Sequence, residues 1–329
     1  MSRLSQADLL QLAAAANQAP SVHNTQPTRW KLADDGALWL LTDTTRQLAV
    51  GDVTGRDLRV SLGATLEASA IVLAEHGIGF GSVSYSNLRA AVRIELTTGA
   101  EGDPLVVQMP HRVTWRKGFA RASWENARAL VAWSERHEDI TRVDAPEEIN
   151  LISALNERTS LAFYRNAAYR NELLYWMRLS PDDPRFGIDG LSAPALGMSG
   201  FEAFGAGHVL RDPLFGLLDR TGVIGSLISE HRRTMSATAI LLFHRPIEEN
   251  PIDTGRALYR RQLELSARGF QTWPMSVLAD DADAAAEIGA HYGLADDRRL
   301  ITAWRTGLVP AGQWLKRERL PAAALIATS

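Results

Sequence analysis

Residues 17–32 read NQAPSVHNTQPTRWKL. Between its two prolines this stretch places five hydrogen-bonding side chains: Ser21, His23, Asn24, Thr25 and Gln26. A connector that only turns the chain does not need so many, and Ser, Asn and Gln side chains can both donate and accept hydrogen bonds. Presented from a turn that ends a helix, they suit a planar heteroaromatic ring with alternating carbonyl and nitrogen edges. The alternative is an Asx-type turn that satisfies its own backbone.

A second polar stretch, PHRVTWRKGF at residues 110–119, carries Arg112, Thr114 and Arg116 at alternate positions. In an extended segment these three side chains point the same way. Two guanidinium groups with a hydroxyl between them suit a phosphate, because each arginine fork pairs with phosphate oxygens through two hydrogen bonds. A solvated basic patch is the other interpretation of this short charged run.

The bulk composition narrows the classes of protein. The chain of 329 residues is 46% hydrophobic and 22% charged, which is ordinary for a soluble globular protein. A net charge of −3 argues against a general nucleic-acid or anionic-membrane binder. The lack of cysteine excludes disulfides, zinc fingers, thiolate-held clusters and cysteine nucleophiles, and it fits a cytoplasmic protein. The eight histidines have no ligand spacing, so we expect no metal site, and no stretch predicts a signal peptide or a membrane span.

Apolar periodicity predicts helices and strands on both sides of residue 108. Before it we expect a helix after a Ser5–Asp8 capping box, a strand at 36–43, a long apolar helix ending at Gly77, and a strand at 91–96. After it we expect helices within 146–165, 171–179, 254–269 and 281–293, and strands at 236–244 and 300–307. The composition and order of these elements indicate an α+β fold.

Two short segments recur along the chain. TGRDL at Thr54 returns as TGRAL at Thr254, and IVLAEHGIGFGSV returns as LELSARGFQTWPMSV. The spacing differs by eight residues between the two matches, so any duplication has diverged. In both halves a strand precedes the helix and another follows it. This order favours a tandem of two α+β units, which we place at residues 1–108 and 109–329.

Residues 187–225 are unlike either unit, because they contain nine glycines. Long glycine-rich segments inside a compact domain are either functional covers or disordered. A lid over a site and a solvent loop are both consistent with this composition.

Several of these segments resemble the flavin-dependent nitroreductase family. APSVHNTQP is similar to the family signature A-P-S-x-x-N-x-Q-P-W, and RVTWR is similar to its R-x-S-x-R/K phosphate motif. GRALYRRQLELSARGFQTWP resembles the central helix and the glycine turn after it, and LITAWRTG resembles the late strand with a basic residue. Ordinary members place the phosphate motif before the A-P-S loop. The inverted order here, and the length, are similar to the Acg-like tandem nitroreductases, in which two units are fused.

The resemblance implies an intrachain pseudo-dimer with one FMN site between its halves. Pro20, Ser21, Asn24 and Gln26 would contact the isoalloxazine ring or ribityl chain. Arg112, Thr114, Arg116 and Arg305 would hold the phosphate, and the turn at Gly269 would bring backbone amides near the ring. The mirrored site should be defective, because GLSAPALGMSG lacks a matching Asn and Gln. Thr28 stands where the family has tryptophan, Trp30 lies two positions on, and His23 replaces a small residue, so the substrate face departs from the family pattern.

The activity implied by the resemblance is that of an FMN-dependent oxidoreductase. NADH or NADPH would deliver hydride to the flavin, and a small acceptor such as a nitroaromatic or a quinone would then take it. The flavin carries the chemistry, so no catalytic acid or base is expected. The alternative is a protein that binds or sequesters FMN beneath the glycine-rich segment with little turnover. Fusion of the halves is consistent with a monomer or with a homodimer.

Overall fold

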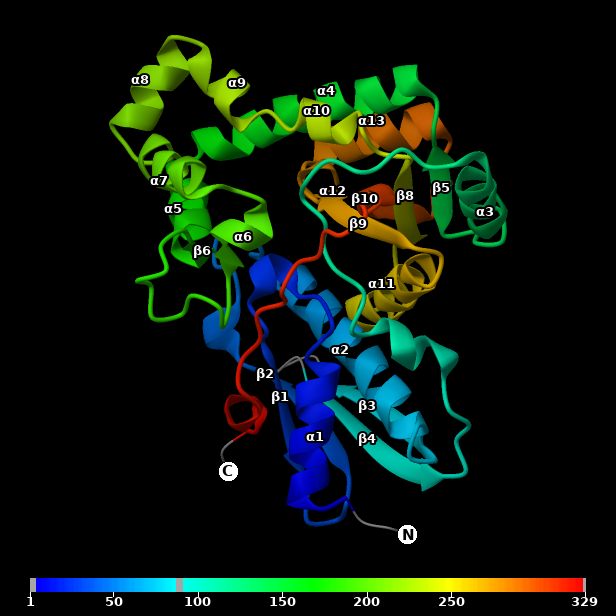
Figure 1. The fold of residues 1–329 in the computed structure, drawn as a ribbon. Helices are drawn as coiled ribbons and strands as arrows, with labels where there is room; N and C mark the ends of the chain where they lie inside the picture. Colours follow the sequence, from blue (N-terminus) through cyan, green and yellow to red (C-terminus); the bar gives the residue numbers. More distant parts are fainter. Residues whose placement is uncertain (1–3, 87–90, 328–329) are drawn as a thin grey trace.

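The structure, a computed structural model, describes residues 4–86 and 91–327. These residues form two four-stranded antiparallel sheets and a helical insertion that extends to one side (Figure 1). Each sheet has one long helix, which lies between its second and third strands in the sequence. The expected α+β class is therefore correct. Among the described residues, no helix is both long enough and apolar enough to cross a membrane.

The first sheet has the strand order β1-β2-β4-β3. Its strands and helices are α1 (Gln6–Ala16), β1 (Thr28–Leu32), β2 (Leu38–Thr42), α2 (Arg56–Ala74), β3 (Ile78–Ser86) and β4 (Ala91–Thr98). The predicted capping box is present at the start of α1, where the Asp8 amide donates to Ser5 Oγ and the Ser5 amide donates to the Asp8 carboxylate. The predicted helix and strands of this region are confirmed, whereas β1 and β3 were not assigned from the apolar pattern.

The second sheet has the strand order β5-β8-β10-β9. Its strands and helices are α3 (Trp124–Ser134), β5 (Ile140–Val143), β8 (Ala239–Pro246), α11 (Pro251–Ser266), β9 (Phe270–Met275) and β10 (Arg298–Leu308). We call each sheet with its helices a group. When the strands of each group are numbered along the chain, both sheets have the spatial order first, second, fourth, third. In both groups the long helix lies between the second and third strands in the sequence.

Two insertions interrupt the second group. The larger one, between β5 and β8, comprises α4 (Pro146–Arg165), α5 (Ala167–Trp176), β6 (Met177–Arg178), β7 (Leu191–Ser192), α6 (Ala193–Leu196), α7 (Gly200–Val209), α8 (Leu214–Arg220), α9 (Val223–Ile228) and α10 (His231–Thr234). The smaller one, between β9 and β10, comprises α12 (Val277–Asp280) and α13 (Ala282–Tyr292). The glycine-rich segment 187–225 is thus a series of short helices rather than a solvent loop.

The two long helices α2 and α11 cross in backbone contact. A Cβ added at Gly63 would lie 1.9 Å from the carbonyl oxygen of Ile252, and one added at Gly255 would lie 2.0 Å from that of Val60. The contact is reciprocal, as in an isologous interface: Gly255 and Ile252 each follow Gly63 and Val60 by 192 positions. Only glycine at both positions lets the two backbones approach this closely.

The crossing also settles the register of the internal repeat. The 192-residue offset pairs Gly77 with Gly269, the turn glycines after the two helices, which have φ of 70° and 82°. It pairs Gly255 with Gly63 and not with Gly55, which caps the start of α2 in a left-handed conformation. The TGRDL and TGRAL match is therefore out of register with the structure, which explains the eight-residue discrepancy.

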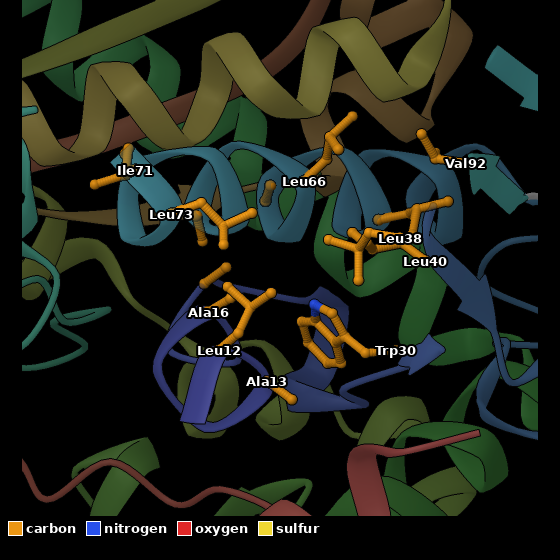
Figure 2. Packing of buried hydrophobic residues seen from close by; sticks show 14 of the residues in the cluster. Leu12, Ala13, Ala16, Trp30, Leu38, Leu40, Leu66, Ile71, Leu73 and Val92 are labelled. Carbon is orange, nitrogen blue, oxygen red and sulfur yellow. The ribbon is translucent and has the colours of Figure 1, made fainter. Parts of the chain in front are cut away.

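The core of the first sheet contains side chains from both long helices. Leu73 of α2 points toward Leu12 and Ala16 of α1 (Figure 2), and Leu66 of α2 belongs to the same cluster. Trp30 is fully buried beside them and donates from Nε1 to Ser69 Oγ at 3.2 Å, so it is a core residue. Leu263 and Tyr259 of α11 belong to the same cluster. Burial of each large apolar side chain contributes about 1.5–3 kcal/mol, so α11 also stabilises the first core.

After the last strand of each group, the chain continues as an extension, here called an arm, that pairs with the other sheet. Beyond β4 the chain passes through Pro104–Gln108 and pairs with the second sheet at Thr114–Thr272 and Ala120–Leu308. Beyond β10 it crosses back and pairs with β1 at Trp30–Ile326. The unit boundary at residue 108 stays a prediction, and the arms show that the two groups are interlocked.

We predict that Gly63→Ala lowers the free energy of unfolding by roughly 1–3 kcal/mol, because the added methyl group forces α2 and α11 apart. Urea unfolding monitored by circular dichroism measures this change. Gly289→Ala is the matched control, since Gly289 lies within α13 with open space around it. That replacement should raise the free energy of unfolding by about 0.5–1 kcal/mol. Equal free energies of unfolding for Gly63→Ala and Gly289→Ala would contradict the close crossing of the helices.

Candidate binding site

The loop after α1 adopts a strained conformation. His23, Asn24 and Gln26 have φ of 44°, 54° and 51°, in the left-handed region that L residues rarely adopt. Such strain persists where surrounding contacts over-determine it, and it often marks a binding site. Within the loop, the Asn24 amide donates to the Ser21 carbonyl at 3.0 Å, and the Gln26 amide donates to Ser21 Oγ at 2.9 Å.

The side-chain amide of Gln26 fastens the loop to distant parts of the chain. Its Oε1 accepts from Asn17 Nδ2 at 2.8 Å and from the Leu320 amide at 2.7 Å, while its Nε2 donates to the Ile188 carbonyl at 2.9 Å. Gln26 is buried by these contacts. It therefore acts on the site by holding the loop in place.

Asn24 also joins three segments. Its Nδ2 donates to the carbonyls of Gly190 and Glu318, each at 3.2 Å, and its Oδ1 accepts from Arg319 at 2.9 Å. The loop is thereby tied to the insertion and to the C-terminal arm.

The segment that follows Pro110 is extended, as its alternation of residues predicts. It lies along β9, where the Trp115 amide donates to the Thr272 carbonyl at 3.0 Å and the Val113 amide donates to Gln271 Oε1 at 2.8 Å. Trp115 is fully buried. Arg112, Thr114 and Arg116 alternate with it and contact the same cavity.

One cavity brings the two sequence-predicted stretches together. Its volume is about 80 Å³, below the 300–1,000 Å³ range of small-molecule sites, so a nucleotide would bind here only with its walls further apart. Its lining comprises Pro20, Ser21, Asn24, Arg112, Val113, Thr114, Arg116, Gly190, Leu191, Ala195, Leu315, Lys316, Arg317, Glu318 and Arg319. The predicted convergence of the loop and the arginine motif is therefore present in the fold.

Arg112 is buried and Arg116 is partly buried, and neither forms an ion pair among the described residues, although the charge of Glu230 acts on Arg116. Arg112 contacts Gln262 Oε1 at 3.4 Å and its Nε has no hydrogen-bond partner; Arg116 donates to the Ala195 carbonyl at 3.2 Å. Burial lowers the pKa of each to about 10, and for Arg112 the nearby Arg317 adds to the shift. Other buried arginines in the chain have a carboxylate, as Arg178 has Asp189 at 2.7 Å. An unpaired buried charge is costly, so the pair is arranged for an anion.

Arg305 and Gly269 are outside this lining. Arg305 lies behind Arg116 and donates to its carbonyl at 3.3 Å, stacks on Trp273 and pairs with Glu230 at 3.3 Å. Burial lowers its pKa to about 10. Gly269 forms the left-handed turn between α11 and β9. Arg305 therefore supports the cavity from outside it, and a role of Gly269 near the ring stays a prediction.

His23 lies beside the arginine motif. Its Nδ1 is buried and has no hydrogen-bond partner among the described residues. Burial, and secondarily the charge of Arg116, lowers the pKa of His23 to about 4, so the ring is neutral near pH 7. The imidazole therefore adds no positive charge to the cationic wall.

The C-terminal arm supplies cavity residues that the sequence reading missed. Arg319 donates to the Asn17 carbonyl at 2.6 Å and to the Gln18 carbonyl at 3.1 Å, at the C-terminal end of α1. Arg317 donates to the carbonyls of Met109 and Pro110, just before the arginine motif. The arm thus fastens the loop and the motif to each other. The charged run KRER at residues 316–319 could have identified these residues as candidates for an anion site. The sequence alone does not indicate that this end of the chain returns to the first sheet.

The glycine-rich segment contributes its first part to the site. Gly190, Leu191 and Ala195 line the cavity. Gly190 has φ of 72°, and a Cβ there would lie 2.3 Å from the Trp176 carbonyl oxygen, so a larger residue does not fit. Farther along, Phe201 and Phe204 of α7 are exposed. Whether the segment opens and closes as a lid stays a prediction.

Comparison with curated proteins gives a partial sequence match. Over 175 residues the chain is 28% identical to the "Putative NAD(P)H nitroreductase acg" of Mycobacterium tuberculosis, in strains CDC 1551 / Oshkosh and ATCC 25618 / H37Rv. The match covers 49% of this chain and 51% of each relative, so the chain spans about half the length of the curated relatives it matches. This partial match agrees with the resemblance to nitroreductases that the motifs suggest. No family model matches the chain.

Two solved structures resemble this chain in part. The FMN and NADPH-dependent nitroreductase NfnB from sphigopyxis sp. strain HMH has a TM-score of 0.39 at 16% identity, covering 69% of this chain and 99% of that one. A nitroreductase with bound FMN from Bacteroides fragilis NCTC 9343 has a TM-score of 0.38 at 12% identity, covering 69% and 100%. These TM-scores indicate a limited correspondence of the chain traces.

We predict that Arg319→Ala lowers the free energy of unfolding by about 1.5–3 kcal/mol, because it removes charge-assisted hydrogen bonds to the end of α1 and to Asn24. Hydrogen exchange at the amides of residues 24–26 should accelerate in the same variant. Arg268→Ala serves as control, since Arg268 also donates to a helical carbonyl, Glu264 at 2.7 Å, but on the surface. The control should change the free energy of unfolding by less than about 0.5 kcal/mol. Unchanged exchange at 24–26 in Arg319→Ala would contradict the fastening role.

Proposed function

We propose that the chain is an FMN-dependent NAD(P)H oxidoreductase with its flavin in the cavity between the two sheets. The observation that supports this most is that Arg112 and Arg116, which form no ion pair among the described residues, share a cavity with the hydrogen-bonding loop. The match to a nitroreductase supplies the family context.

The phosphate of FMN fits the arginine motif. Arg112, Thr114 and Arg116 line the same cavity, and a phosphate would supply the counter-charge that the two guanidinium groups lack. Arg305 would act from behind, by holding the Arg116 backbone and by adding positive charge. This assignment gives a chemical role to the buried Arg112 Nε, which has no other partner.

The hydrogen-bonding groups on the loop side of the cavity match the edge of the FMN ring. Pro20, Ser21 and Asn24 line this side and offer the hydrogen-bonding groups that a heteroaromatic edge requires. Gln26 would act indirectly, because its amide is already bonded to Asn17, Ile188 and Leu320. Bound FMN would accept hydride from NADH or NADPH and pass it to a small acceptor such as a nitroaromatic or a quinone. The protein residues bind and orient the cofactor.

We also propose that the chain is an intrachain pseudo-dimer of two nitroreductase-like units. The matching strand orders and the reciprocal contact of Gly63 and Gly255 support this proposal. A monomer with one such internal interface, in the cytoplasm, is the simplest arrangement consistent with it.

The alternative function, FMN binding or sequestration with little turnover, is supported by one feature. Gly190, Leu191 and Ala195 of the glycine-rich segment form part of the cavity wall, so this segment would lie against a bound flavin. A wall that stays closed would keep a nicotinamide away from the ring.

We predict that Arg116→Ala weakens FMN binding by roughly 10- to 150-fold, which corresponds to the loss of about 1.5–3 kcal/mol for a charge-assisted contact. Titration followed by flavin fluorescence measures the dissociation constant. Riboflavin, which has no phosphate, should bind equally to both proteins, and Lys117→Ala, at the exposed neighbouring position, should bind FMN like the wild type. Full FMN affinity in Arg116→Ala would exclude the phosphate assignment.

We predict that the purified protein is yellow. Addition of NADH or NADPH without oxygen should bleach the visible absorbance band of the bound flavin. Steady-state oxidation of each nicotinamide with a nitroaromatic or a quinone then identifies the reductant. Bound flavin that dithionite reduces but neither nicotinamide bleaches would favour the sequestering protein. A colourless protein that binds no added FMN would refute both functions.

A further inference from the structure

Glu318 differs in charge from the rest of the cavity wall. Among the described residues that line the cavity, Glu318 alone is acidic, whereas five are basic: Arg112, Arg116, Lys316, Arg317 and Arg319. Glu318 is buried, with 9% of its surface exposed. A carboxylate in such surroundings would be expected to pair with an arginine.

The carboxylate of Glu318 has no such partner in the described part of the chain. None of the ion pairs there includes it, and its Oε2 accepts no hydrogen bond. The adjacent Arg317 and Arg319 donate to backbone carbonyls and to Asn24 instead. Burial raises the pKa of Glu318, and a hydrogen bond from the Ser192 side chain and the charge of Lys316 oppose this, so Oε2 is the carboxylate atom without a donor. A buried acceptor without a donor is as costly as a buried donor without an acceptor.

The position of Glu318 places this acceptor on the loop side of the cavity. Its backbone carbonyl accepts from Asn24 Nδ2 at 3.2 Å, and Asn24 in turn contacts Gly190. The Glu318 side chain also hydrogen-bonds to Ser192, next to Leu191 of the cavity wall. The acid therefore lies on the side of the cavity formed by the insertion and by the loop that suits a ring.

We propose that the Glu318 carboxylate accepts a hydrogen bond from the ring imide N–H of the bound flavin, and that it is a specificity-determining residue for the ring edge. This inference rests on the proposed function, because it requires a flavin in the cavity. The isoalloxazine imide presents one N–H between two carbonyl groups, and a carboxylate is the strongest acceptor that a side chain offers to it. A negative charge beside the ring also opposes the addition of electrons to it.

The binding test uses a ligand that lacks only the proposed donor. Wild-type protein should bind riboflavin on the order of tenfold more tightly than 3-methylriboflavin, whose imide nitrogen carries no hydrogen. Glu318→Ala should bind the two with equal affinity, because the acceptor is gone. Glu101→Gln is the control for charge, since Glu101 is exposed and does not line the cavity. It should retain the wild-type preference.

The redox test separates a ring contact from a structural role. Glu318→Gln keeps the shape of the side chain and removes its charge, so the midpoint potential of bound FMN should rise. A tenfold change in the relative affinity for reduced and oxidised FMN corresponds to about 30 mV for a two-electron couple. Circular dichroism and the unfolding midpoint confirm that the variant folds.

The outcomes distinguish the inference from the proposed function. If the wild type binds FMN through Arg116 but the preference for riboflavin over 3-methylriboflavin is absent, or persists in Glu318→Ala, the role of Glu318 is refuted and the FMN site stands. An unchanged midpoint potential in Glu318→Gln would also refute it. If no flavin binds to the wild type, the proposed function and the inference both fail.

Discussion

The close crossing of α2 and α11 is the constraint on which the rest of the molecule depends. Because Gly63 and Gly255 each lie against a carbonyl of the other helix, the two sheets are held at one fixed separation. The arms that leave β4 and β10 then reach across this seam and pair with the opposite sheet. The cavity is lined from the first group by residues 20–24, from one arm by 112–116 and from the other by 315–319. Neither group of elements could build it alone.

Buried charge identifies the site more clearly than the shape of the cavity does. The chain contains several buried arginines, and comparison among them is informative. Arg178 has Asp189, and Arg305 has Glu230, whereas Arg112 and Arg116 have neither a carboxylate nor a full set of hydrogen bonds among the described residues. Desolvation of a guanidinium group is tolerated only where something compensates it. Where the protein supplies no compensation, a ligand anion is the remaining source.

The sequence predicted the local elements and missed the long-range ones, for physical reasons. Apolar periodicity predicted α2, α11, β8 and β10, because burial of one face is a local pattern. The alternation of Arg112, Thr114 and Arg116 predicted a shared face correctly. By contrast, the return of residues 316–319 to the loop depends on where β10 ends in space. The repeat was aligned wrongly at TGRAL because a pentapeptide match ignores which glycine makes the helix contact.

The role of a residue in the site follows from what its polar atoms already contact. Gln26 matches a family motif, yet its amide is committed to Asn17, Ile188 and Leu320, so its contribution is to keep a strained loop in shape. Glu318 matches no motif, yet its Oε2 accepts no hydrogen bond within a cavity lined by basic residues. A ligand that carries a phosphate at one end and a ring N–H at the other would satisfy both the arginine pair and this carboxylate. The charge pattern of the cavity therefore favours a flavin nucleotide over a simple anion, which would leave the carboxylate without a donor.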